Sequence, residues 1–149
     1  MKDRCFLDTN LLIYAWDNTE VEKKNIILSF LHNIEIDSNP IISTQTLGEF
    51  YNVATKKLKL SKDNACLICK TYASTFPLYE ITKENVFHAM QISKTTQFSY
   101  WDSLIIAMAI DTDCSVLYSE DLNPGQQIEG VRIINPFTSR ASAFKILLK

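Results

Sequence analysis

The chain has 149 residues, of which 46% are hydrophobic and 21% charged, and its formal net charge is −2. This length and composition predict one compact domain with a sizeable core, and they exclude a fibrous or wholly disordered protein. The sequence lacks an apolar stretch of the roughly 20 residues that cross a bilayer, and "MKDRCFLDTN" lacks the apolar segment of a secretory signal, so we expect a cytoplasmic protein.

Short apolar segments alternate along the chain with longer segments of helical period. We predict strands at residues 4–7, 40–43, 78–81, 115–118 and 131–134. The helices between them are predicted at 11–16, 21–33, 46–58, 62–75, 83–95 and 101–111. Alternation of this kind is typical of βαβ units around a parallel sheet, so the predicted class is α/β.

The first predicted strand ends at a carboxylate, in the stretch "CFLDTNLLIYAWD". Asp8 follows the apolar residues 4–7, and open α/β sheets place their binding crevices at the carboxyl ends of strands. A second interpretation is that Asp8 or Asn10 only caps the short helix that follows. The sequence leaves both interpretations open.

Two later helices have clear apolar patterns. The helix at 46–58 is predicted to have an apolar face, and the helix at 101–111, "WDSLIIAMAID", is apolar nearly all round and is expected to lie deep against the sheet. The four cysteines are expected to be reduced thiols, and neither "CLIC" nor the two isolated histidines have the spacing of a zinc site. The predicted apolar face of the helix at 46–58 consists of Leu47, Phe50, Tyr51, Ala54 and Leu58.

Four carboxylates follow predicted strands or open predicted helices: Asp8, Glu49, Asp102 and Asp121. In a parallel sheet these positions gather at one edge, where four anions would repel one another and have raised pKa values. A divalent cation would offset that repulsion. Carboxylate ligands with few nitrogen or sulfur donors favour Mg²⁺ or Mn²⁺, and such a centre can assist phosphodiester hydrolysis.

Each acid also has a purely structural alternative. Thr46 and Glu49 match the capping box T-x-x-E, Ser99 and Asp102 nearly match it, and Asp121 lies where a turn favours aspartate. A haloacid-dehalogenase-like phosphatase would likewise begin with a strand that ends in aspartate, but its second acid is replaced here by Asn10. A non-catalytic RNA-binding or interaction module is a further alternative.

Four segments together resemble the PIN-domain proteins, and more closely the VapC-type toxins of bacterial toxin-antitoxin pairs. Their order and spacing carry the resemblance, which covers residues 4–137, so we expect a domain at 1–137 and a tail at 138–149. The segments are "FLDTNLLIY", "IISTQTLGEFYNVATKKL", "YWDSLIIAMA" and "LYSEDLNPGQQIEGVRIINPF".

The resemblance implies a three-layer α/β/α fold with a small central parallel sheet and a pocket of acids that binds Mg²⁺ or Mn²⁺. By position, the acids are Asp8, Glu49, Asp102 and Asp121, which would act as catalytic residues and metal ligands. Ser119 replaces the usual threonine of the last motif, and its neighbour Glu120 leaves the register of that loop open. Supporting roles are expected for Thr9, Asn10, Ser119 and Glu120.

The implied substrate is single-stranded RNA. Asn52, Lys56 and Lys57 follow Glu49 and are expected to contact it, and the lysines of "TKKLKLSK" would make binding sensitive to salt. The resemblance further implies an endoribonuclease that leaves a 5′-phosphate, a homodimer and a small antitoxin protein as partner. A housekeeping PIN nuclease of RNA maturation would have the same four acids.

Overall fold

The structure is a computed structural model that describes residues 3–140. Its centre is one six-stranded sheet in the order β3-β2-β1-β4-β6-β5, parallel except for the antiparallel pair β5–β6. The strands are β1 (Arg4–Leu7), β2 (Asn39–Ser43), β3 (Leu78–Tyr79), β4 (Val116–Tyr118), β5 (Gln127–Ile128) and β6 (Val131–Ile134).

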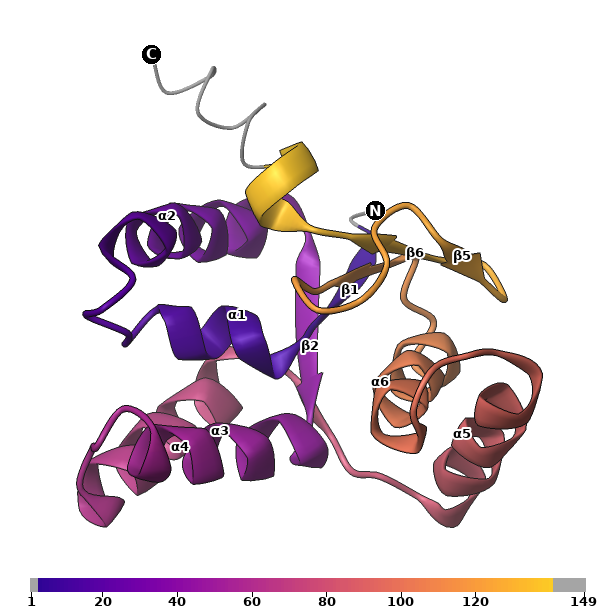
Figure 1. Cartoon of the computed structure of the whole chain (residues 1–149), viewed down its shortest axis with the longest axis horizontal. Coiled ribbons are helices and arrows are strands. Elements are labelled where there is room, and N and C mark those ends of the chain that lie inside the picture. Colours follow the sequence, from indigo (N-terminus) through magenta and orange to yellow (C-terminus); the bar gives the residue numbers. More distant parts are fainter. Residues whose placement is uncertain (1–2, 141–149) are drawn as a thin grey trace.

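Helices cover both faces of the sheet, which confirms the predicted three-layer α/β/α class (Figure 1). Side chains of β1 alternate between the two layers: Cys5 and Leu7 pack against helices α1 to α4, and Phe6 packs against α5 and α6. The helices are α1 (Thr9–Tyr14), α2 (Val21–Asp37), α3 (Thr44–Lys56), α4 (Lys62–Thr75), α5 (Lys83–Thr95) and α6 (Tyr100–Asp111), followed by the π-helical turn Pro136–Arg140.

Most predicted elements are present, with shifted ends. The strands at 4–7 and 131–134 and the helices at 62–75 and 83–95 have the predicted bounds, whereas α1 begins and ends two residues earlier and α2 continues to Asp37. Strand β5 was not predicted; its two residues pair with β6 through a turn with positive φ at Glu129 and Gly130. Residues 141–149 of the predicted tail lie outside the described residues.

The interior largely follows the predicted pattern. Residues 103–109 of α6 are all buried, as expected of a helix that is apolar nearly all round. On α3, Phe50 and Ala54 are buried, but Tyr51 is 37% exposed and does not belong to the apolar face, contrary to the prediction.

All four cysteines are free thiols. No helix in residues 3–140 combines the length and hydropathy that crossing a membrane requires.

His88, which is not one of the predicted site residues, has a structural role. Its Nδ1 lies 2.8 Å from a carboxylate oxygen of Asp111, and its Nε2 lies 2.9 Å from one of Glu129. Burial opposes protonation of His88, but these two carboxylates outweigh it and raise its pKa above the usual value. The side chain therefore ties α5 to the end of α6 and to the β5–β6 turn.

Candidate active site

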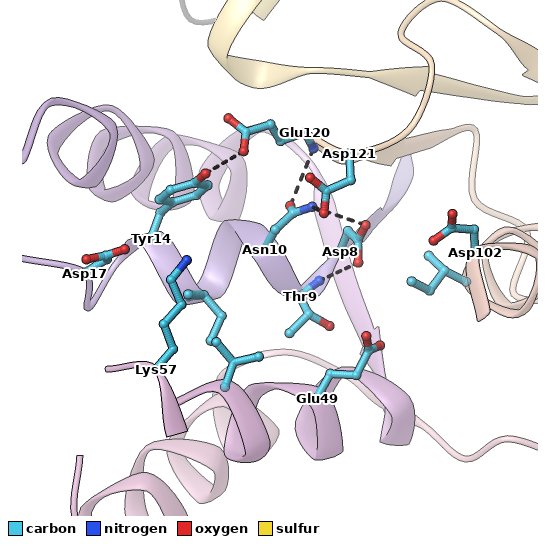
Figure 2. Close-up of a pocket in the computed structure, with 13 residues that line it drawn as sticks. Asp8, Thr9, Asn10, Tyr14, Asp17, Glu49, Lys57, Asp102, Glu120 and Asp121 are labelled. Atoms are coloured by element: carbon cyan, nitrogen blue, oxygen red, sulfur yellow. Dashed lines mark hydrogen bonds between the residues drawn. The ribbon is translucent and has the colours of Figure 1, made fainter. Parts of the chain in front are cut away.

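The four predicted acids line one pocket of about 280 Å³ at the edge of the sheet where β1 and β4 end (Figure 2). Asp8 follows β1, and Asp121 lies just beyond β4. Glu49 lies in the second turn of α3, and Asp102 lies in the first turn of α6. Segments from distant parts of the chain therefore bring the carboxylates together as the parallel topology predicts. The pocket is also lined by Thr9, Asn10, Ile13, Tyr14, Asp17, Val53, Lys57, Ile105 and Glu120.

Asp8 is the most buried of the four acids, with 6% of its surface exposed. Its Oδ1 accepts from the backbone N–H of Thr9 at 2.7 Å, and its Oδ2 accepts from Ser119 Oγ at 2.7 Å. Burial raises its pKa to about 7, against the effect of these hydrogen bonds and with help from the charges of Glu49 and Asp121. Asp8 is also the N-cap of α1, so both interpretations of its position hold.

Asn10 and Ser119 connect Asp8 to Asp121. Asn10 Nδ2 donates to Asp121 Oδ2 at 2.9 Å and lies 3.5 Å from Asp8 Oδ2. Ser119 Oγ, which donates to Asp8, accepts from the backbone N–H of Asp121 at 3.2 Å. These contacts place Asp121, rather than its neighbour Glu120, in the network around Asp8.

Glu120 is held by a different set of partners. Its Oε2 pairs with Lys23 Nζ at 2.6 Å, and its Oε1 accepts from Tyr14 Oη at 2.5 Å, as Figure 2 shows for the tyrosine. Lys23 also lies over the rings of Tyr14 and Phe137. The sequence singled out neither Lys23 nor the Tyr14 hydroxyl, because they are separated from Glu120 by 97 and 106 residues and no motif spacing relates them.

Glu49 is exposed and Asp102 is half-buried. Partial burial raises the pKa of Glu49, and the negative charge of Asp102 adds to the effect. The capping box predicted from Thr46 and Glu49 is wrong: the box of α3 consists of Ser43 and Thr46, so capping makes no use of the Glu49 carboxylate. At α6, the Ser99 hydroxyl accepts from the backbone N–H of Asp102, as its N-cap position predicts.

The predicted substrate contacts divide into two groups. Lys57, which is the C-cap residue of α3, lines the pocket, whereas Asn52 and Lys56 are exposed on α3 outside it. Asp17 also lines the pocket but accepts from the backbone N–H and the hydroxyl of Thr19. Of the three predicted contact residues, Lys57 is therefore the one that lines the pocket, on the side of Tyr14 and Asp17 (Figure 2).

The donor set suits a hard divalent cation, because it consists of carboxylates with amide and hydroxyl groups beside them. The hydroxyl of Thr9, which is buried in the pocket wall, has no hydrogen-bond partner among the described residues. As they stand, no three His, Cys, Asp or Glu side chains within residues 3–140 are grouped closely enough to hold a metal ion. The chemistry of the residues fits a cation, which would draw the carboxylates inward.

Comparison with known proteins agrees with this geometry. Residues 5–126 match the model of the PIN domain family. No curated protein sequence matches significantly. Among solved structures, VapBC2 from Rickettsia felis bound to a promoter DNA fragment is similar with a TM-score of 0.66 and 18% identity, over 89% of this chain and 98% of that one.

Two further structures are similar to the same extent. DNA-bound VapBC from Salmonella typhimurium has a TM-score of 0.64 and 23% identity over 87% of this chain and 96% of its own. VapC20 from Mycobacterium tuberculosis, described as a toxin that cleaves the sarcin-ricin loop, has a TM-score of 0.62 and 12% identity over 78% of this chain and 89% of its own. Likeness at these identities shows a shared fold.

Proposed function

The chain belongs to the PIN domain family, and on that premise we propose that it is a metal-dependent endoribonuclease that cleaves single-stranded RNA. The observation that carries the proposal is the meeting of four carboxylates in one pocket, with the most buried of them held by two hydrogen bonds at the end of β1. The catalytic acids in this proposal are Asp8, Glu49, Asp102 and Asp121.

The residues of the pocket have different roles in the proposed hydrolysis. The four acids would hold Mg²⁺ or Mn²⁺, and the bound cation supplies positive charge to the scissile phosphate and lowers the pKa of water. Ser119 and Asn10 orient Asp8 and Asp121 by the hydrogen bonds described above. Lys57, on the same pocket wall, binds a neighbouring phosphate of the RNA backbone. Cleavage leaves a 5′-phosphate and a 3′-hydroxyl.

The nuclease is proposed to be the toxin of a toxin-antitoxin pair. Two of the similar structures are VapBC complexes, and they support an antitoxin protein as partner. A homodimeric toxin is also part of the proposal and rests on the sequence resemblance alone. Expression of the chain alone is then expected to arrest growth, and co-expression of a short neighbouring gene to relieve the arrest. Harmless expression of active enzyme would instead favour a nuclease of RNA maturation.

A fluorescent single-stranded RNA tests the nuclease proposal directly. Incubation with Mg²⁺ or Mn²⁺ is expected to yield products with 5′-phosphate ends, and EDTA or Asp102→Asn is expected to abolish them. Lys70→Gln, on the exposed surface of α4 outside the pocket, serves as the purification control and should cleave normally. Cleavage that persists in both EDTA and Asp102→Asn would come from a contaminant and contradict the proposal.

Substitutions in the loop after β4 test which acid belongs to the centre. Asp121→Asn is expected to reduce kcat/KM by roughly 100-fold or more, because a carboxylate that helps to hold the proposed cation contributes several kcal/mol to catalysis. Glu120→Gln is expected to lose less than about tenfold, since Lys23 and Tyr14 hold Glu120 apart from Asp8. Steady-state cleavage of one RNA by both variants measures the difference. A larger loss in Glu120→Gln would show that Glu120, and not Asp121, is the fourth acid of the centre.

The lysines of α3 can be separated by the salt dependence of RNA binding. Lys57→Gln is expected to weaken binding and to reduce the slope of log K against log salt by about 0.7, the value for one phosphate contact on a single strand. Lys56→Gln removes the same charge outside the pocket and should change the slope less. Fluorescence anisotropy in EDTA at several salt concentrations provides the comparison, and equal effects would place the RNA along the exposed side of α3.

A further inference from the structure

A second cavity adjoins the acidic pocket and shares two of its carboxylates. It has a volume of about 490 Å³, within the range of roughly 300–1,000 Å³ typical of ligand pockets. Asp102 and Asp121 line both cavities and therefore stand at their common border. The remaining lining comes from the α5–α6 connection and the loop after β4, and includes Gln97, Phe98, Asn123 and Gln126.

Uncharged polar groups dominate this second cavity. Its lining residues include no lysine, arginine or histidine, while two carboxylates stand at one side. A phosphate would therefore meet repulsion without a compensating cation. A neutral ligand with hydrogen-bond donors and acceptors fits the lining better, because glutamine and asparagine amides offer both.

Several of these amide groups are available for a ligand. The Gln97 side chain makes no hydrogen bond within residues 3–140. Asn123 Nδ2 and Gln126 Oε1 are 3.4 Å apart, a contact that leaves Asn123 Oδ1 and Gln126 Nε2 without a described partner. The hydroxyls beside them are already used, since Thr96 donates to Ile92 O and Ser99 caps α6.

The wall that carries these amides is anchored to the sheet. Leu122 is buried in the core next to α6, and Phe98 packs against the same core. In the loop, the Gly125 N–H donates to Ile133 O at 2.8 Å, and the Ile133 N–H donates to Gln126 O at 2.9 Å. The backbone of Gln126 is thus fixed to β6, so its side chain extends from a defined position.

We propose that this second cavity is a nucleobase subsite, in which the amides of Gln97, Asn123 and Gln126 hydrogen-bond an unpaired base next to the cleaved phosphate. The inference rests on the proposed nuclease function and adds a source of sequence preference to it. The geometry supports it because a base in the second cavity places its own sugar-phosphate at the shared border, beside Asp102 and Asp121. Unpaired bases are read through such contacts to their edges.

Cleavage of a single-stranded RNA pool with randomised bases, followed by sequencing of the product ends, tests the subsite. The wild type is expected to prefer one base at a fixed position beside the cut. Gln126→Met and Gln97→Met keep the length of each side chain but remove its hydrogen bonds. Each is expected to lower the ratio of kcat/KM between the preferred RNA and a non-preferred one by roughly 5- to 100-fold.

Matched substitutions guard against a general effect of adding methionine. Gln127→Met and Gln91→Met change residues outside both cavities and are expected to keep the preference. Far-UV circular dichroism confirms that all four variants fold. A wild type without base preference, or Gln126→Met and Gln97→Met that both keep it, would overturn the subsite while the nuclease function stands.

Binding in EDTA separates failure of the subsite from failure of the nuclease proposal. Anisotropy with single-stranded RNAs that differ in one base is expected to give base-selective affinity that Gln126→Met and Gln97→Met reduce. If the RNA is never cut but this selective binding is observed, the nuclease proposal is wrong, and the second cavity stands only as a base-binding site without a cleaved phosphate beside it. Equal affinity for all bases, with or without the substitutions, would contradict the subsite whether or not the RNA is cut.

Discussion

Mg²⁺ or Mn²⁺ is expected to raise the melting temperature of the metal-free protein by about 5 to 10 °C at pH 8, and by much less at pH 5. A cation at 100 times its Kd stabilises the folded state by about 2.7 kcal/mol, which for a chain of this size corresponds to that shift. The pH dependence follows from Asp8, because burial raises its pKa to about 7 and a metal ligand must lose its proton.

The raised pKa of Asp8 also determines how the stability of the metal-free protein depends on pH. Between pH 4 and pH 7 an unfolded Asp8 is ionised, while the folded one retains its proton, so the folded state binds more protons. Stability in EDTA should therefore fall as the pH rises through this range, by up to about 4 kcal/mol for a shift of some three pKa units. The raised pKa of Glu49 acts in the same direction.

Urea unfolding in EDTA at pH 5 and pH 8 measures this slope, and differential scanning fluorimetry measures the metal effect. NaCl at matched ionic strength controls for general screening of charge. Asp121→Asn, which removes one proposed ligand, should reduce the metal-induced shift. An equal metal effect at both pH values would show that no cation relieves the charge on Asp8. Stability in EDTA that rises with pH would show that the pKa of Asp8 is not raised in the folded protein.

The elements that local chemistry determines were predictable from the sequence, and those that depend on tertiary pairing were not. Helices α4 and α5 have N-caps, Ser61 and Thr82, that fix their first residues. Strand β5 has only two residues and forms because it pairs with β6. The capping box of α3 lies three residues before the one considered from the sequence, because Thr46 with Glu49 matches the signature S/T-x-x-E/Q, whereas in the structure Thr46 replaces the Glu or Gln and pairs with Ser43.

The site shows the same division. Each of the four acids follows a predicted strand or lies near the start of a predicted helix, so their meeting at one sheet edge could be inferred from the order of the elements. The face of α3 beyond Glu49 was predicted only in part. Of the three expected contacts, Asn52 and Lys56 at i+3 and i+7 lie outside the pocket, whereas Lys57 at i+8 lines it together with Val53 at i+4. On a helix surface, the positions i+3 and i+7 and the positions i+4 and i+8 all lie on the side of Glu49. Packing of α3 against α1 decides which of the two pairs faces the pocket.

Asp8→Asn is expected to abolish activity and to stabilise the protein at the same time. Loss of the buried ligand should reduce RNA cleavage by roughly 100-fold or more. In EDTA at pH 8, removal of a buried charge should raise the free energy of unfolding by up to about 4 kcal/mol, with little gain at pH 4 where Asp8 is protonated. Asparagine can accept from the Thr9 N–H and donate to the Ser119 hydroxyl, so both contacts survive.

Asp17→Asn, in the same pocket, is expected to change the stability of the protein in the opposite direction. Hydrogen bonds from Thr19 lower the pKa of Asp17, so its ionised form stabilises the fold, and that contribution is present above the unfolded pKa and lost as the pH falls through the folded one. Its replacement should therefore destabilise at pH 8. Urea unfolding of both variants at pH 4 and pH 8 compares them. A stabilised Asp8→Asn that loses its cleavage activity identifies a carboxylate retained for chemistry at a cost in stability, whereas a destabilised one would mean that the ionised Asp8 carboxylate itself stabilises the fold.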